Sequence, residues 1–346
     1  MRKTNPEQCK REVSFRAGEA LLAGTLTMPP TGAPRAGVVM IPGSGPADRD
    51  NSGYFVPIRD HLARHGIAVL CYDKPGIGGS SGDWRGQTLR DRAVEALAAL
   101  HFLQGRDDVG PTRVGLYGHS QGGWVVPLAA SMSRDVAFVV AVSGPGVCPA
   151  EQGVYAVEHG MRADGWSEDQ VAEAVAFVAR VVDAARRDED FASIEPALRR
   201  ARDHAWFASL PKYFPIPDAE LWGFSRRRDP VTDRAFVDYQ PVPVLERVTC
   251  PVLAIFGQLD WVVPVERSAA IYETALTRAG NQHFAVTVFP KADHRIRIAD
   301  PDDFAPGFLD AVTGWILRHA DPTRDRRDAS VPIRPSAPTR RTRSPR

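Results

Sequence analysis

The sequence predicts an α/β fold in which a mostly parallel central sheet is flanked by helices. Up to residue 147, short apolar runs typical of strands alternate with helical patterns, and this alternation indicates a parallel sheet. Residues 148–242 break the alternation and have helical patterns, and strand-like runs return after residue 243. We therefore expect one α/β core, residues 12–147 and 243–320, with a helical lid inserted over residues 148–242.

The elements of this core follow from the apolar pattern in chain order. Residues 12–15 and 21–28 predict a leading hairpin pair, and residues 89–102 predict an apolar-periodic helix. The remaining predicted strands are short runs rich in Val, Ile, Leu and Ala, bounded in most cases by Gly or Pro: residues 36–41, 67–72, 113–117, 136–142, 251–257 and 284–290. Runs that are apolar on both faces favour buried strands.

Within the insertion, Ser167 and Gln170 form a capping-box pattern in front of an apolar helical stripe. A second helix is predicted over residues 194–208, followed by an aromatic and proline-rich stretch over residues 206–239. Lids shape substrate pockets and exclude water. The aromatic side chains therefore have two interpretations: they line an acyl site, or they pack inside the lid itself. For most of them, packing is an equal or better interpretation.

Composition limits the choice of function classes. The chain has 346 residues, and 43% of them are hydrophobic, which supports a large buried core. Its net charge is +1, so the chain as a whole has no strong electrostatic attraction to nucleic acid or to a membrane. Residues 321–346 carry eight Arg and three Asp with few apolar residues, so we expect a disordered basic tail. Such a tail can touch acidic surfaces or RNA, but a solvated extension is the favoured interpretation, and no nucleic-acid partner is expected. Residues 1–11 are expected to be a flexible N-terminus.

The four cysteines are widely spaced without a C-x-x-C pair, so nothing in the sequence demands a disulfide, a metal or a cofactor. The N-terminal residues lack the apolar run of a signal peptide, and no uncharged run of about 18 apolar residues predicts a membrane span. We expect a cytoplasmic protein that does not associate with a membrane. The sequence leaves the oligomeric state open.

The most informative motif is Gly118-His119-Ser120-Gln121-Gly122, a G-x-S-x-G pattern between a predicted strand and a predicted helix. A strand, a sharp turn and a helix at this pattern form a nucleophile elbow, which exposes the serine hydroxyl above the sheet. The glycines allow the close approach of strand and helix. We therefore predict that Ser120 is a catalytic nucleophile. The alternative is a glycine-rich turn of a nucleotide-binding type that happens to contain a serine.

A serine nucleophile needs a base, and the base needs an orienting carboxylate. Asp260 follows the predicted strand 251–257 and His294 follows the predicted strand 284–290, so both lie at the carboxyl edge where Ser120 lies. We predict Ser120, Asp260 and His294 as a catalytic triad, with Asp293 as the rival acid. The other eight histidines lie beside the serine, in predicted helices, in the insertion or at the wrong end of a strand: His61, His65, His101, His119, His159, His204, His283 and His319.

The loop Pro42-Gly43-Ser44-Gly45-Pro46 follows the third predicted strand and is built from small residues. Backbone N–H groups there can approach a ligand, so we predict an oxyanion hole formed by the Ser44 and Gln121 N–H groups. An ordinary Gly/Pro turn is the alternative. For substrate contact we name residues on the loops at the same edge: Gly43, Gly45, Gly144, Pro145 and Trp261.

With these motifs in place, the chain resembles the α/β-hydrolase superfamily, and most of all bacterial esterases of its dienelactone-hydrolase-like and acyl-thioesterase-like branches. Three motifs carry the resemblance. Residues 43–50 match G-S-G-P-x-D-R-D, residues 72–80 are similar to Y-D-x-R-G-x-G-x-S, and the elbow is similar to G-H-S-E-G-G with Gln121 in place of the glutamate. The resemblance covers about residues 12–147 and 243–319.

This chain departs from the pattern of these esterases at two further places. Pro42 stands where relatives usually carry His, and Lys74-Pro75 replaces a usual Lys/Asp-Arg pair. Neither change removes a predicted triad member. We expect Asp48, Arg49 and Asp50 to form a structural ion-pair cluster, with a direct substrate contact from Arg49 as the less favoured interpretation.

These observations predict a serine hydrolase that cleaves a small-molecule carboxylic ester or thioester through an acyl-enzyme, without a cofactor. Three alternatives stay open. An acyltransferase would use the same triad, a peptidase of the prolyl-oligopeptidase type is disfavoured by the absence of a propeller-like domain, and a ligand-binding protein would have lost catalysis.

Overall fold

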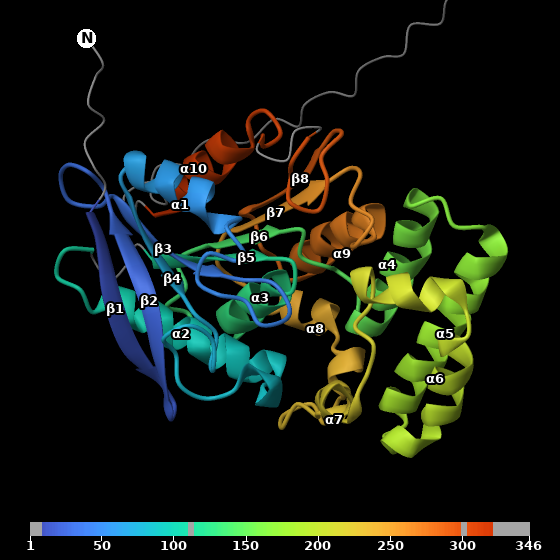
Figure 1. Ribbon diagram of the computed structural model, residues 1–346. Coiled ribbons are helices and arrows are strands. Elements are labelled where there is room, and N and C mark those ends of the chain that lie inside the picture. Colours follow the sequence, from blue (N-terminus) through green and yellow to red (C-terminus); the bar gives the residue numbers. More distant parts are fainter. Residues whose placement is uncertain (1–8, 110–113, 299–302, 321–346) are drawn as a thin grey trace, which may run out of the picture.

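The computed structural model describes residues 9–109, 114–298 and 303–320. Eight strands form one sheet in the order β1-β2-β4-β3-β5-β6-β7-β8 (Figure 1). The hairpin β1–β2 is antiparallel and pairs antiparallel with β4, whereas the neighbouring strands from β4 to β8 are parallel, so the predicted mostly parallel sheet is confirmed. The strands are β1 (Cys9–Ala17), β2 (Ala20–Met28), β3 (Ala36–Ile41), β4 (Ile67–Tyr72), β5 (Val114–His119), β6 (Val139–Val142), β7 (Val252–Gly257) and β8 (Phe284–Phe289).

Helices cover both faces of the sheet (Figure 1). Every residue of β3, β4, β5 and β7 is buried, which explains why these strands are apolar on both faces. One apolar core lies under α2 (Leu89–Gln104), α3 (Gly122–Met132), α8 (Pro241–Leu245) and α9 (Val265–Arg278). A second core lies under α1 (Phe55–Arg64) and α10 (Phe308–His319) on the opposite face.

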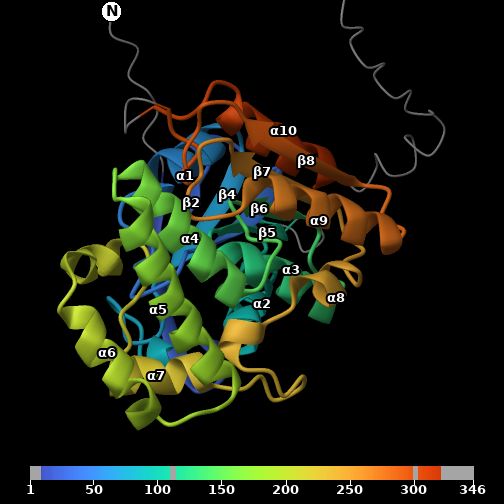
Figure 2. The ribbon, with the colours of Figure 1, turned by 90° about the vertical axis from the view of Figure 1, so that its right-hand side faces the viewer.

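Between β6 and β7 the chain leaves the sheet and forms a helical block. Its helices are α4 (Pro149–Ala163), α5 (Glu168–Arg186), α6 (Glu195–Arg202) and α7 (Ala219–Arg226). Figures 1 and 2 show this block on one side of the α/β core, and it has an apolar core of its own. The predicted capping box is present at the start of α5, where Ser167 and Gln170 cap each other's backbone N–H groups.

Several predicted boundaries need correction. The strand predicted over residues 136–142 begins only at Val139, the first residue of β6. The helix predicted over residues 194–208 stops at Arg202, because His204 is extended and a 3₁₀ segment follows over Ala205–Lys212. Residues 9–11, which the sequence places in a flexible N-terminus, instead pair with the end of β2 in the antiparallel hairpin. Residues 1–8 and the predicted basic tail, 321–346, lie outside the described residues.

None of the helices in the described ranges combines the length and the apolar character that a membrane crossing requires.

Candidate active site

The turn between β5 and α3 holds Ser120 in a left-handed conformation, with φ 55°. Such a φ is strained for a residue with a side chain, and it projects the serine out of the turn. Glycines make the turn possible: a Cβ on Gly118 would lie 2.2 Å from the carbonyl oxygen of Gly122, and a Cβ on Gly122 would lie 2.4 Å from that of Ile41. The Ser120 N–H donates to Val142 O at 2.9 Å, which ties the turn to β6. The local geometry is that of a nucleophile elbow.

The loops after β7 and β8 bring a carboxylate and an imidazole together. His294 Nδ1 lies 2.8 Å from Asp260 Oδ2. The other oxygen of Asp260 accepts the N–H groups of Val262 at 2.8 Å and Val263 at 3.0 Å, and its side chain is fully buried. His294 and the half-buried Ser120 line one cavity, with Asp260 behind the imidazole. The structure therefore brings the three predicted triad residues to one place.

His119 has a role that the sequence did not reveal. On sequence grounds His119 is set aside as a neighbour of the serine, but its side chain lines the same cavity, and its Nε2 lies 3.2 Å from the backbone oxygen of His294. Its Nδ1 lies 3.3 Å from the Asn51 side-chain nitrogen, which is a donor, so Nδ1 accepts and Nε2 donates. Burial holds the pKa of His119 well below its ordinary value, in agreement with a neutral ring. His119 thus supports the backbone of the loop that carries His294.

The loop after β3 lies against the nucleophile. Gly43, Ser44 and Gly45 line the cavity, and a Cβ on Gly43 would touch the Ser120 Cβ at 3.4 Å. Within the described part of the chain, no acceptor takes the N–H of Ser44 or of Gln121. Lys74, only 1% exposed, donates from Nζ to Gly43 O at 2.6 Å and to Gly45 O at 2.7 Å. Burial lowers the pKa of Lys74 well below its ordinary value.

A second buried cation ties this loop to the elbow. Arg92 Nη1 donates to Gln121 Oε1 at 2.7 Å, and Arg92 Nη2 lies 3.4 Å from Pro42 O. Glu95, one helical turn further along α2, is also buried, and burial raises its pKa to about 7. The sequence contains a signal for these residues, because positions 92 and 95 lie within the apolar stripe of α2, where charged residues are rare.

The cavity has a volume of about 670 Å³ and lies between the carboxyl edge of the sheet and the helical block. Its wall includes seven aromatic side chains among the described residues: Trp84, Trp124, Tyr213, Phe214, Phe224, Phe236 and Trp261. Of the predicted substrate-contact residues, Gly43, Gly45, Pro145 and Trp261 line it, whereas Gly144 does not and instead packs against Gly123. Aromatics of the helical block divide between the cavity wall and the packed core of the block, to which Trp206 and Trp222 belong.

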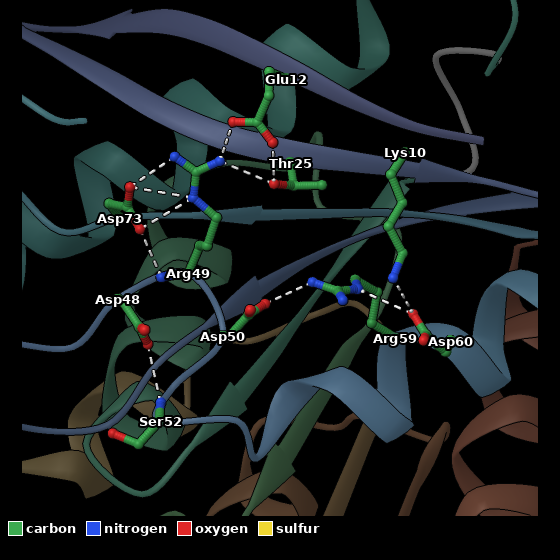
Figure 3. A network of polar contacts seen from close by, with 10 residues as sticks. All are labelled: Lys10, Glu12, Thr25, Asp48, Arg49, Asp50, Ser52, Arg59, Asp60 and Asp73. Carbon is green, nitrogen blue, oxygen red and sulfur yellow. Dashed lines mark hydrogen bonds and ion pairs between the residues drawn. The ribbon is translucent and has the colours of Figure 1, made fainter. Parts of the chain in front are cut away.

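The acidic and basic residues that follow the loop of residues 42–46 form ion pairs with neighbouring elements of the fold (Figure 3). Arg49 pairs with Asp73 at 2.7 Å and also with Glu12 of β1, while Asp50 pairs with Arg59 of α1 at 2.6 Å. Burial would raise the pKa of Asp73, but the hydrogen bonds from Arg49 hold it below its ordinary value. Arg49 does not line the cavity, so the contacts of Arg49 and Asp50 agree with the expected ion-pair role rather than with substrate contact. Asp48 instead accepts the backbone N–H of Ser52 at 2.9 Å.

Among the residues that the structure describes, no group of three or more His, Cys, Asp and Glu side chains has the spacing to hold a metal ion.

Comparison with known proteins identifies relatives of the chain. A family model described as alpha/beta hydrolase family matches residues 38–306. Esterase EstD of Thermotoga maritima is 28% identical over 281 residues, which are 79% of this chain and 57% of EstD. The chain thus spans little more than half the length of that relative.

Solved structures resemble the fold. An esterase of Pyrococcus furiosus, Pf2001, matches with a TM-score of 0.60 and 18% identity over 90% of this chain and 91% of its own. A proline iminopeptidase of Mycobacterium smegmatis matches with a TM-score of 0.57 and 18% identity over 90% of this chain and 99% of its own.

Proposed function

The chain belongs to the alpha/beta hydrolase family, and from that premise we propose that it cleaves small-molecule carboxylic esters or thioesters through an acyl-enzyme on Ser120. The observation that carries the proposal is the meeting of three features at one cavity. Ser120 stands at a strained elbow with φ 55°, His294 lines the same cavity, and Asp260 holds the imidazole at 2.8 Å. This is the constellation that activates a serine hydroxyl.

In the first half of the reaction, Ser120 Oγ attacks the acyl carbon while His294 Nε2 removes the hydroxyl proton. Asp260 accepts the hydrogen bond from Nδ1, which keeps Nε2 free to accept that proton and stabilises the imidazolium. The tetrahedral intermediate carries its negative charge on the former carbonyl oxygen, where the N–H groups of Ser44 and Gln121 stabilise it. His294 then gives the proton to the leaving alcohol or thiol, and the acyl group stays on Ser120.

In the second half, water enters and His294 Nε2 removes one of its protons as the oxygen attacks the acyl carbon. The second tetrahedral intermediate uses the same two N–H groups. Its collapse breaks the bond to Ser120 Oγ, which takes the proton back from His294, and the carboxylic acid leaves. No step requires a cofactor.

The helical block, residues 148–242, acts in this proposal as a lid that supplies much of the acyl site. Tyr213, Phe214, Phe224 and Phe236 come from this block and line the cavity opposite the elbow. An aromatic wall of this kind favours an apolar acyl group and excludes water from the reacting bond. The cavity of about 670 Å³ falls within the usual range for small-molecule sites.

The test is hydrolysis of a p-nitrophenyl ester series from acetate to decanoate, beside acyl-CoA thioesters of the same chain lengths, by the wild type and Ser120→Ala. We expect hydrolysis that falls by several orders of magnitude in Ser120→Ala. Equal rates in the two proteins would remove Ser120 from the mechanism. Adding a competing alcohol or amine separates hydrolysis from acyl transfer, because transfer would yield the new ester or amide in place of the acid.

A further inference from the structure

Lys74 is a buried lysine that pairs with backbone instead of a carboxylate. It follows β4 directly, its side chain is 1% exposed, and no carboxylate of the described residues forms a salt bridge with it. Its Nζ donates to the carbonyl oxygens of Gly43 at 2.6 Å and Gly45 at 2.7 Å, on either side of Ser44. Burial of an ammonium group is costly unless its donors are satisfied. The two hydrogen bonds that satisfy the buried ammonium group therefore also fix the orientation of these two carbonyl groups.

The direction of the Gly43 carbonyl determines the direction of the Ser44 N–H. Both groups belong to one peptide unit, which is planar, and the described residues contain no cis peptide bond. In a trans unit the C=O and N–H bonds point in opposite directions. Because Lys74 holds the Gly43 oxygen on its own side, the Ser44 N–H points away from Lys74.

The Ser44 N–H belongs to a cavity residue beside the nucleophile and is left without an internal acceptor among the described residues. The loop lies directly on the nucleophile, since a Cβ on Gly43 would touch the Ser120 Cβ. Arg92 holds the Gln121 side chain and approaches Pro42 O, so the residue that carries the second predicted donor is also tied to a buried cation.

We propose that Lys74 is a positioning residue of the oxyanion hole, one that locks the Gly43–Ser44 peptide so that the Ser44 N–H is presented to the developing oxyanion. The inference rests on the proposed function, because only a reaction through an oxyanion uses that N–H. Without Lys74, the Gly43 oxygen loses its donor, and rotation of the peptide would turn a carbonyl oxygen toward the cavity. A carbonyl oxygen there repels the charge that the N–H would stabilise.

The test compares Lys74→Met with Lys10→Met. Methionine keeps the length and apolar stem of the side chain but donates no hydrogen bond. Lys10 of β1 is exposed, pairs with Asp60 at 3.4 Å and does not line the cavity, so it controls for the loss of a positive charge away from the site. The kinetic constants are measured with p-nitrophenyl butyrate. Inhibition is measured with a trifluoromethyl ketone, which forms a tetrahedral adduct on the serine, and with the methyl ketone of equal length.

Lys74→Met is expected to lose about 100-fold in kcat, the usual effect of removing one oxyanion donor, with KM nearly unchanged. Its affinity for the trifluoromethyl ketone falls by a similar factor, and its affinity for the methyl ketone stays the same. Lys10→Met keeps the kcat of the wild type. Lys74→Gln, which retains an amide donor, recovers part of the loss, and it replaces Lys74→Met in the comparison if the methionine variant does not fold.

Three results would overturn the inference. One is an unchanged kcat in folded Lys74→Met, and another is a higher KM at constant kcat, which would make Lys74 a substrate-binding residue. The third is equal weakening of both ketones, as a general collapse of the site would give. A wild-type protein without Ser120-dependent hydrolysis is a different result: it would refute the proposed function and leave Lys74 without an oxyanion to serve.

Discussion

Asp260 and His294 form a hydrogen-bonded pair in which the carboxylate is more firmly held than the imidazole. Asp260 Oδ2 lies 2.8 Å from His294 Nδ1, and Asp260 Oδ1 accepts the backbone N–H groups of Val262 and Val263. The carboxylate therefore cannot turn away from the ring, and the ring has one orientation that satisfies it. In the proposed mechanism, Asp260 therefore orients His294 and leaves its Nε2 for the serine.

Asp260→Asn is the variant that tests this assignment. The amide keeps the shape of the side chain but removes the charge that stabilises the imidazolium and can fix the wrong tautomer of His294. We expect kcat to fall by about 10³- to 10⁴-fold with little change in KM. Steady-state kinetics with a p-nitrophenyl ester measures both constants.

Asp293→Asn is its matched control, because Asp293 is the other acid on the histidine loop. Its carboxylate accepts the N–H groups of Arg295 and Arg297 and so shapes the turn. We expect its kcat to stay within about tenfold of the wild-type value. The assignment would be reversed if Asp293→Asn lost the larger factor.

His119→Leu should slow the reaction without weakening substrate binding. The variant loses the contacts to the His294 backbone and to Asn51, so the histidine loop has more freedom near the nucleophile. One such lost hydrogen bond corresponds to about tenfold in kcat. His119→Gln, which can still donate to the loop, should recover part of it. A lower melting temperature with unchanged kcat in His119→Leu would limit His119 to a structural role.

Phe214→Ala should shift the preferred acyl chain toward longer esters. The ring of Phe214 lines the cavity and packs on α4 against Gly153, so its removal enlarges the acyl site. Phe207→Ala is the control, because Phe207 packs against Phe177 and Trp206 in the helical block and does not line the cavity. The p-nitrophenyl ester series measures the preference. An identical profile in both variants would contradict the proposal that the block forms the acyl site.

Glu95 should make the stability of the protein depend on pH. Burial raises its pKa to about 7 in the folded protein, against about 4.5 in an exposed chain, while Arg92 and Lys74 lower it and Asp91 raises it slightly. A raised pKa means that folding takes up a proton. The contribution of Glu95 to the free energy of unfolding is therefore complete below about pH 4.5 and declines as the pH rises to about 7. The decline amounts to at most ~3 kcal/mol.

Urea denaturation of the wild type and Glu95→Gln at pH 5 and pH 8 measures this effect. Glutamine keeps the oxygen that accepts from Gln87 and carries no charge, so the variant should gain stability relative to the wild type at pH 8 and little at pH 5. A constant difference between the two proteins at both pH values would show that Glu95 does not titrate in this range.

The buried strands could be predicted from the sequence because their signal is local. The structure gives strands at the predicted bounds for residues 36–41 and 67–72, since each is an unbroken apolar run. The helix predicted through residue 208 was wrong, because its apolar pattern continues past the point where His204 leaves the helix. Packing of Trp206 in the helical block accompanies this change of direction, and no local pattern reports such packing.

The residues of the candidate site likewise divide into those that the sequence predicts and those that it does not. Ser120 lies in a motif of five neighbouring residues, and Asp260 and His294 follow from strand order, so all three could be named from the sequence. The role of Lys74 could not be predicted from the sequence, because its partners are carbonyl groups about 30 residues away, and their direction depends on the folded loop. The burial of Arg92 likewise depends on Gln121 and Pro42, which reach it only when the sheet has formed.

The most direct test of the mechanism is to react the full-length protein with a fluorophosphonate and locate the adduct by peptide mass spectrometry. The reagent phosphonylates a serine only when a base activates it. The proposed mechanism predicts one adduct, on the peptide that contains Ser120, with its formation greatly slowed in His294→Ala. A folded protein that forms no adduct, or that carries it on another residue, would contradict the assignment of Ser120 as the nucleophile.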